Sequence, residues 1–324
     1  MKDEDYAYAV ARIRANEKKL LTGGDIEALL KCKTLDEVVR FLQSREWIDK
    51  NEESFDIGKA VAYNQKRLWT LLTESVPCKD ELFVFTVQND FFNIKAALKC
   101  MLTSNSAKEL FVFPTSLDLD MTVENMQKHN FSAFGSAFSS ACKQAYEIAC
   151  RTQNGQNAEI ILDKAAIVYI EKLAENNSCA LVRDIADFLC AAAVMKTAYR
   201  CAVTKRSLSF AQTAIAECKY FSSEVLARLS VEGEQALIEY LKKSQFSKGI
   251  ELLSMNSAAF EKWCDDTVTE MTKRAKMMFF GFEPICAYYY AKQAEIKTVR
   301  IILGAKQSGF SDEAIRERVR ALYV

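Results

Sequence analysis

The chain has 324 residues, of which 50% are hydrophobic and 27% charged, with 43 Lys and Arg against 43 Asp and Glu. This balance excludes general disorder, and it argues against nucleic acid as the main partner because phosphate binding leaves a strongly basic footprint. Ten Gly and three Pro leave few turn-forming residues, so long helices are expected to carry most of the chain.

The first predicted helix runs from Tyr6 to Leu21, where apolar residues recur at helical spacing. The segment 22–25 is expected to end it, since its two Gly accept C-cap geometry and Asp25 can N-cap the next helix. Thr34 with Glu37 three residues later is a capping-box signature. It predicts a further helix from Thr34 to about Ser44.

The remaining predicted helices cover residues 56–76, 79–103, 131–153, 157–175, 178–205, 207–220, 222–243, 257–280, 283–303 and 311–322. Helix breakers fall between them or at their edges, namely Pro77, Pro114, Asn154-Gly155, Gly281 and Gly304. The apolar run 110–113 could be a strand, but without partner strands we interpret it as a buried helix end or a loop. The predicted fold class is all-α.

Three predicted helices form an internal repeat. They align without gaps over residues 81–102, 175–196 and 283–304, with an apolar stripe at helical spacing. A polar residue precedes the central apolar residue each time: Asn93, Asp187 and Glu295. Any three amphipathic helices can be slid into partial agreement, so the pattern alone leaves a true repeat open. If it is real, the chain consists of three similar helical bundles, with domains at 1–117, 118–211 and 212–324.

Residues that could carry chemistry are sparse. His129, the one histidine, lies in a polar stretch and is expected to be a solvated loop residue. No phosphate-binding loop and no nucleophile elbow occurs in the sequence. The pairs Asp265-Asp266 and Asp118 with Asp120 could hold a divalent cation or serve as acid and base, but their spacing matches no calcium loop. We therefore predict no catalytic, cofactor-binding or metal-binding residue.

Two further features concern location and surface. Eleven Cys form no CxxC pair, and residues 1–5 lack an apolar signal region, which favours a reducing cytoplasm. The longest apolar stretch, 188–195, is shorter than the roughly 20 residues of a membrane span. The run Tyr288-Tyr289-Tyr290 could stack bases, although core packing or a partner contact is the better interpretation. Residues 292–320 carry three excess positive charges, which could be a solvated helical face or a docking surface.

The segment from Glu283-Pro284 to Leu303, followed by residues 315–318 and Tyr323-Val324, resembles the C-terminal signature of the C subunit of archaeal and bacterial A/V-type rotary ATPases. The d subunit of the eukaryotic V-ATPase belongs to the same family. Residues 6–14 and the block 89–95 resemble the family's other two marks, in the expected order. Residues 104–280 match only as a helical pattern.

The resemblance implies a funnel-like protein of three similar helical domains around a pseudo-threefold axis, without an active site or cofactor. It also implies a peripheral position on the cytoplasmic face of the membrane, between the central-stalk axle and the membrane rotor ring of an ion-transporting ATPase or ATP synthase. Five arginines are candidate docking residues: Arg12, Arg14, Arg316, Arg318 and Arg320.

Three alternatives remain open at this point. A generic helical-repeat scaffold for soluble partners would show the same three-unit pattern. A helical enzyme using carboxylates or Lys would be stabilised by its ligand. A nucleic-acid binder using the basic C-terminal segment would lose affinity steeply with salt.

Overall fold

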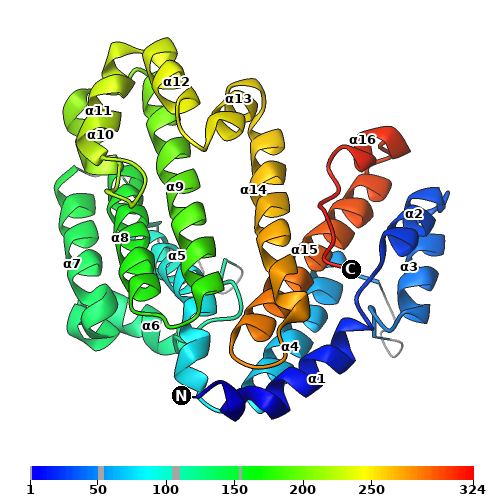
Figure 1. The fold of residues 1–324 in the computed structure, drawn as a ribbon. Helices are drawn as coiled ribbons and strands as arrows, with labels where there is room; N and C mark the ends of the chain where they lie inside the picture. Colours follow the sequence, from blue (N-terminus) through cyan, green and yellow to red (C-terminus); the bar gives the residue numbers. More distant parts are fainter. Residues whose placement is uncertain (1, 50–54, 104–109, 153–154) are drawn as a thin grey trace. The chain divides into compact units, whose positions relative to one another are not determined.

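The computed structural model describes residues 2–49, 55–103, 110–152 and 155–324 (Figure 1). Its α-helices are α1 (Ala7–Glu17), α2 (Gly23–Lys31), α3 (Leu35–Ser44), α4 (Ile57–Ser75), α5 (Phe83–Thr103), α6 (Leu119–Gln127), α7 (Gly135–Thr152), α8 (Gly155–Glu175), α9 (Ala180–Val203), α10 (Leu208–Ala214), α11 (Ser223–Glu232), α12 (Glu234–Lys242), α13 (Ser247–Met255), α14 (Ser257–Thr272), α15 (Glu283–Gln307) and α16 (Asp312–Arg316). Short 3-10 helices are η1 (Asp3–Tyr6), η2 (Lys79–Leu82), η3 (Phe131–Phe134) and η4 (Lys273–Met277). The described residues contain no strand, and the all-α prediction is confirmed.

Side-chain caps start several of these helices. Thr34 is the N-cap of α3, and its Oγ1 accepts from the Glu37 amide at 3.3 Å, as predicted. The prediction that Asp25 caps α2 is wrong by three residues. Thr22 is the N-cap. The Asp25 carboxylate accepts a hydrogen bond from the Thr22 amide at 2.8 Å, so the two residues form a capping box.

Several predicted helix ends differ from the observed ones. Gly233 adopts φ +129 and divides the predicted helix 222–243 into α11 and α12. The predicted helices 207–220, 257–280 and 311–322 are shorter in the structure, as α10, α14 with η4, and α16. Gly304 does not end α15, which continues to Gln307, and α6 and α13 were not predicted. Residue 153 and Asn154, which belong to a predicted helix and a predicted break, lie outside the described residues.

Contacts between residues divide the chain into two compact units. Unit 1 comprises residues 1–80, 179–185 and 252–324, and unit 2 comprises residues 81–178 and 186–251. The three-domain division at 117/118 and 211/212 and its pseudo-threefold arrangement stay predictions. No described helix has both the length and the apolar character needed to cross a bilayer.

Unit 1 is organised around the 25-residue helix α15, which contacts α1, α3, α4, α14 and α16. Its apolar face supplies Ile296, Val299 and Leu303 to a buried cluster with Leu29 and Leu42 of α2 and α3. Helices from the two ends of the sequence therefore share one core. Burial of such side chains contributes about 1.5–3 kcal/mol each.

Unit 2 has its core where α5, α7 and α8 pack together. Phe91 of α5 meets Phe138 of α7 edge to face, with ring centroids 4.9 Å apart. The loop at 110–113 is irregular, as one of the two interpretations of this run expected, but Leu110 and Phe113 are exposed and not buried.

The polar residues of the internal repeat are all buried, and each holds a segment outside its own helix. In unit 2, Asn93 exchanges two hydrogen bonds with Val112, at 2.9 and 3.0 Å, and Asp187 pairs with Lys219. In unit 1, Glu295 accepts from the Leu21 amide at 2.7 Å and from the Trp47 indole at 2.9 Å. A buried polar group must be hydrogen-bonded, so this position constrains both helix and loop.

Candidate functional site

The five candidate arginines all lie in unit 1, on α1 and in the segment that follows α15. The structure separates them into two groups. Arg14 and Arg320 each make several bonds to other parts of the unit, whereas Arg12 and Arg316 each make one ion pair and Arg318 one ring contact. Arg316 and Arg318 are exposed, and Arg12 is half-buried.

Arg14 joins α1 to the segment before α15. One guanidinium nitrogen donates to both carboxylate oxygens of Glu17 at 2.8 Å, and the other donates to the carbonyls of Ala275 at 2.7 Å and Met278 at 2.6 Å. Burial opposes the charge, but the hydrogen bonds and charge of Glu17 outweigh it and raise the pKa of Arg14. The contacts indicate a structural role, and a docking role stays untested.

Arg320 is a buried cation with 7% of its surface exposed. Its Nε donates to Asp265 Oδ2 at 2.7 Å, and a terminal nitrogen donates to the Arg318 carbonyl at 2.6 Å. The neighbouring Asp266 accepts from the Ala321 amide at 2.6 Å. The carboxylate pair considered as a metal or acid–base site therefore fastens the C-terminal segment to α14, and docking by Arg320 stays untested.

The other three arginines are placed where a partner could reach them. Arg12 pairs with Glu74 at 3.2 Å, and Arg316 pairs with Glu27 at 2.8 Å. Arg318 lies over the Phe310 ring, 5.3 Å from its centroid. Exposed pairs of this kind add only about 0–1 kcal/mol to stability, so a partner can replace them at little cost.

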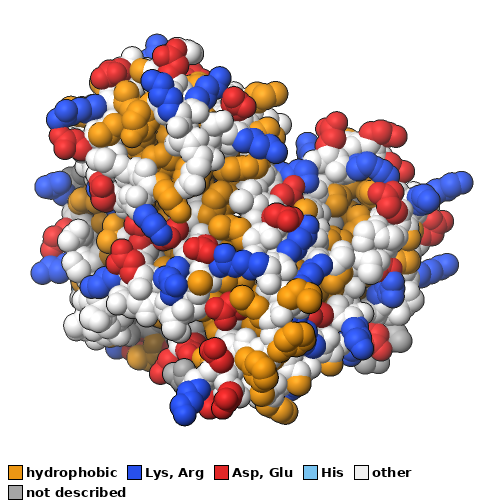
Figure 2. All heavy atoms as spheres, in the orientation of Figure 1, with side chains coloured by type: hydrophobic (Ala, Val, Ile, Leu, Met, Phe, Trp, Pro, Cys, Tyr) orange, Lys and Arg blue, Asp and Glu red, His pale blue; other side chains and the backbone are white. Residues whose placement is uncertain are grey.

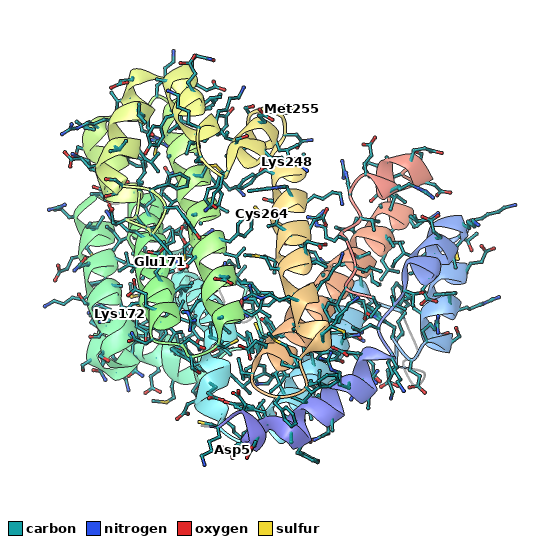
Figure 3. All side chains as sticks on the ribbon, viewed as in Figure 1. Asp5, Glu171, Lys172, Lys248, Met255 and Cys264 are labelled. Carbon is teal, nitrogen blue, oxygen red and sulfur yellow. The ribbon has the colours of Figure 1, made fainter. Side chains whose placement is uncertain are left out.

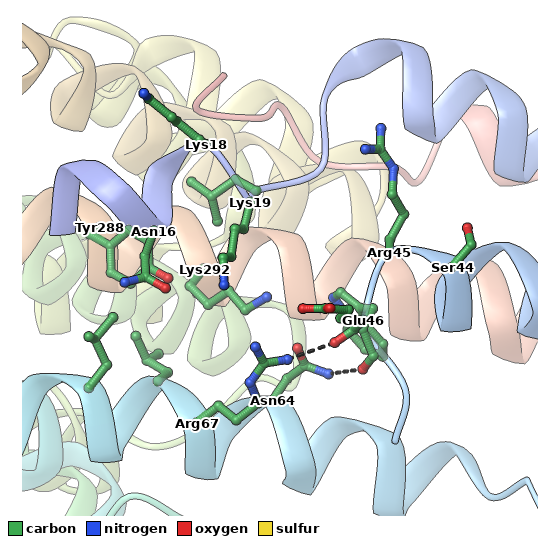
Figure 4. Close-up of a pocket in the computed structure, with 14 residues that line it drawn as sticks. Asn16, Lys18, Lys19, Ser44, Arg45, Glu46, Asn64, Arg67, Tyr288 and Lys292 are labelled. Atoms are coloured by element: carbon green, nitrogen blue, oxygen red, sulfur yellow. Dashed lines mark hydrogen bonds between the residues drawn. The ribbon is translucent and has the colours of Figure 1, made fainter. Parts of the chain in front are cut away.

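A cavity of about 290 Å³ opens in unit 1 between α1, α4, α15 and the turn after α3 (Figure 4). Its lining includes five cations: Lys18, Lys19, Arg45, Arg67 and Lys292. Figure 4 shows the ends of Lys19, Arg67 and Lys292 directed into the cavity and those of Lys18 and Arg45 directed away from it. This cavity could not be predicted from the sequence because its lining comes from four separate segments, and only the Lys18-Lys19 pair marks it.

Two of the three inward cations already have partners. Lys292 pairs with buried Glu295 and lies 5.9 Å from the Trp47 ring, and Arg67 donates to the Glu46 carbonyl at 2.6 Å. Tyr288 also lines the cavity, and burial followed by the Glu295 charge raises its pKa, so the phenol stays protonated at neutral pH. The cavity can thus accept an anionic side chain at Lys19 but offers no phenolate base.

The remaining candidate groups have structural surroundings. His129 is exposed in a turn, as expected, with its ring 4.4 Å from that of Tyr146. Asp118 is the N-cap of α6. Tyr288 and Tyr289 are buried, which confirms core packing and removes them as an open stacking platform. Among the described residues no group of three or more His, Cys, Asp or Glu could hold a metal ion.

Comparison with known proteins places almost the whole chain in one family of similar sequences. The sequence profile of the ATP synthase (C/AC39) subunit family matches residues 9–318. The chain is 22% identical to the C subunit of the V-type sodium ATPase of Enterococcus hirae, over 96% of this chain and 97% of that protein. It is 21% identical to the C subunit of the A-type ATP synthase of Methanocaldococcus jannaschii, over 98% and 86% respectively. With a match that runs almost from end to end, the chain belongs to the ATP synthase (C/AC39) subunit family.

Proposed function

We propose that the chain is a non-catalytic central-rotor subunit of a V-type (A/V-type) ATPase or ATP synthase. In this role it links the central-stalk axle to the membrane rotor ring and transmits torque for ion transport. The observation that carries the proposal is the family match over residues 9–318, with both relatives covered over at least 86% of their length. The proposed location is peripheral, on the cytoplasmic face of the membrane.

The mechanical properties of unit 1 support such a role. Helix α15 has 25 residues and therefore extends about 37 Å, and no Pro interrupts it after its first turn. Hydrogen bonds link segments far apart in sequence: Arg14 of α1 donates to Ala275 of η4, Glu295 of α15 accepts from the Leu21 amide, and Asp266 of α14 accepts from the Ala321 amide. A part that transmits torque needs such cross-links, because a helix held only by apolar contacts can slide.

Co-purification of the tagged chain from its own cells in mild detergent tests the proposal. We expect the axle subunits and the membrane ring to be recovered, with one copy of this chain per complex. Recovery of soluble proteins alone, under conditions that keep the rotary ATPase assembled, would contradict the proposal and favour the helical-repeat scaffold.

Docking by the exposed arginines is a separate part of the proposal. The double variant Arg316→Glu/Arg318→Glu should retain its fold, because only a surface ion pair and a ring contact are lost. We expect its recovery with the complex to fall at least about fivefold, since rim charges act on association. Arg228→Glu, which breaks an exposed pair on α11, is the matched control. Equal recovery of both variants would remove these arginines from the interface.

A further inference from the structure

The last residue of η4 and the start of the connection to α15 expose four consecutive large apolar side chains, at residues 277–280. Met277, Met278, Phe279 and Phe280 are 78%, 39%, 68% and 56% exposed. We call this segment the 277–280 loop. Figure 2 shows hydrophobic side chains gathered over the place where Figure 1 draws the connection into α15.

The backbone of the 277–280 loop is held from both sides. Arg14 donates to the carbonyls of Ala275 and Met278. On the other side the Gly281 amide donates to the Asp3 carbonyl at 3.2 Å, and the next residue, Phe282, packs against the Tyr6 ring with centroids 6.0 Å apart. The apolar tips are thus presented on a fixed backbone, so little chain entropy is lost when a partner covers them.

Exposed apolar side chains in a row usually mark an interaction site, because monomers rarely leave a contiguous apolar patch in water. Met and Phe are enriched in the buried cores of protein interfaces, where a few such residues carry most of the affinity. Packing in the core of unit 1 does not account for the apolar character of the 277–280 loop, because its four side chains are exposed.

The charges around the loop define the partner. The adjacent η1 exposes three successive acids, Asp3, Glu4 and Asp5, and Asp5 is labelled at this end of unit 1 in Figure 3. Two of the three cations of η4 are neutralised, because Lys273 pairs with Glu270 and Arg274 pairs with Asp184. Lys276 lies over the Tyr323 ring and keeps its charge, so the three acids of η1 outnumber it. An acidic border around an apolar tip complements a basic protein surface and is repelled by an anionic bilayer.

We propose that the 277–280 loop is a docking knob that inserts into an apolar pocket of a neighbouring protein subunit, with Lys or Arg around the rim of that pocket. This inference rests on the proposed function, because the neighbouring subunit belongs to the same rotary complex. It assigns the central contact to Phe279 and Phe280 and the steering charge to Glu4.

The test measures the dissociation constant between the purified chain and the complex prepared from cells that lack it. The double variant Phe279→Ser/Phe280→Ser should bind at least about tenfold more weakly. Met255→Ser is the matched control, since Met255 is 80% exposed at the junction of α13 and α14 (Figure 3) and should leave the affinity unchanged. Glu4→Lys should lower the association rate and its dependence on salt.

Three results would overturn the inference, and they separate it from the proposed function. If the unmodified chain does not bind the complex, both the proposed function and the docking role of the 277–280 loop are contradicted. If it binds and the Phe double variant binds equally well, only the knob fails. If the loop instead drives binding to vesicles of phosphatidylcholine with 30% phosphatidylserine, and the Phe double variant loses this binding while keeping its affinity for the complex, the occupant is lipid and the proposal is wrong.

Discussion

At the scale of single residues, buried charged side chains fasten segments of unit 1 to its apolar core. Arg320 is buried against Asp265, which also binds Lys297 at 2.6 Å. A buried ion pair adds little compared with an apolar pair, but removing one partner leaves a charge without compensation. The C-terminal segment therefore depends on Arg320 more than its position near the chain end suggests.

Arg320→Met should lower the free energy of unfolding by about 2–4 kcal/mol, because Asp265 then keeps only the half-exposed Lys297. Arg318→Met is the control, two residues away and exposed, and should change it by less than about 0.5 kcal/mol. Urea unfolding followed by circular dichroism measures both. Equal losses for the two variants would show that the Arg320 pair is not what fastens the segment.

Tyr323 gives unit 1 a specific response to alkaline pH. Burial, then the charge of Glu17, raises the pKa of Tyr323 to about 12. The ordinary value is about 10, so the fold favours the protonated phenol. Its contribution is complete below pH 10 and is lost as the pH rises from 10 to 12. Tyr323→Phe should therefore make stability fall less steeply between pH 10 and 11.5 in urea unfolding, and an unchanged slope would contradict this.

Residue environments could be predicted only in part. Charge alone selects Arg318 and Arg320 together, yet one is exposed and the other is buried. The difference is made by Asp265, which precedes Arg320 by 55 positions, and no local pattern reports such a pairing. The signal for the buried polar positions is clearer, because Asn93, Asp187 and Glu295 interrupt apolar helix faces. A polar residue on such a face is expected to be hydrogen-bonded.

At the scale of elements, α15 shows that glycine is a breaker only where the backbone requires it. Gly304 lies inside the helix, and a Cβ built there meets nothing within 4 Å. Gly281, just before the helix, has φ +84, and a Cβ there would lie 2.8 Å from a carboxylate oxygen of Glu283. Residue type alone does not distinguish the two positions, so the sequence predicts a break at both.

Alanine substitution at the two glycines should have opposite effects. Gly304→Ala should raise the free energy of unfolding by about 0.5–1 kcal/mol, since it removes backbone freedom from the unfolded chain without a clash. Gly281→Ala should lower it by about 1–2 kcal/mol, the cost of left-handed geometry for an L-residue. Thermal unfolding of the two variants side by side measures the difference, and a change of the same sign in both would contradict the assignment.

The long helices were predictable and the short ones were not. α4, α5, α8, α9 and α15 have several turns of apolar periodicity, which fixes their existence even where an end is misplaced. α6 and α13 have nine residues each, too few turns for a clear period. In 207–220 the apolar residues Ile215 and Ala216 are buried in irregular backbone after α10. Because they are apolar, they continue the helical spacing in the sequence, and the predicted helix extends too far.

At the scale of the whole molecule, all eleven cysteines are free thiols. Seven are buried, three are half-buried and Cys150 is exposed. Burial raises the pKa of Cys142 and Cys179 to about 12 and that of Cys218 to about 11, which keeps them protonated and unreactive at neutral pH.

Titration with Ellman's reagent at pH 8 should therefore proceed in two stages. The exposed and half-buried thiols should react first in the native protein, and all eleven should react in guanidinium chloride. A reducing agent should leave the melting temperature unchanged. Fewer than eleven reactive thiols after unfolding without reductant would show that disulfides are present.

The sequence order of the two compact units affects how the protein is made on the ribosome. Unit 2 is built from residues 81–251 almost without interruption, whereas unit 1 combines residues 1–80 with residues 252–324. Translation proceeds at roughly 5–20 residues per second, so α1 to α4 wait for tens of seconds before α15 emerges. During that interval Leu29, Leu42 and their neighbours lack Ile296, Val299, Ile302 and Leu303 of α15, against which they pack in the complete unit. The apolar side chains of the nascent N-terminal segment therefore stay partly uncovered until residues 252–324 have been synthesised, and a chaperone that covers them in this interval would prevent aggregation.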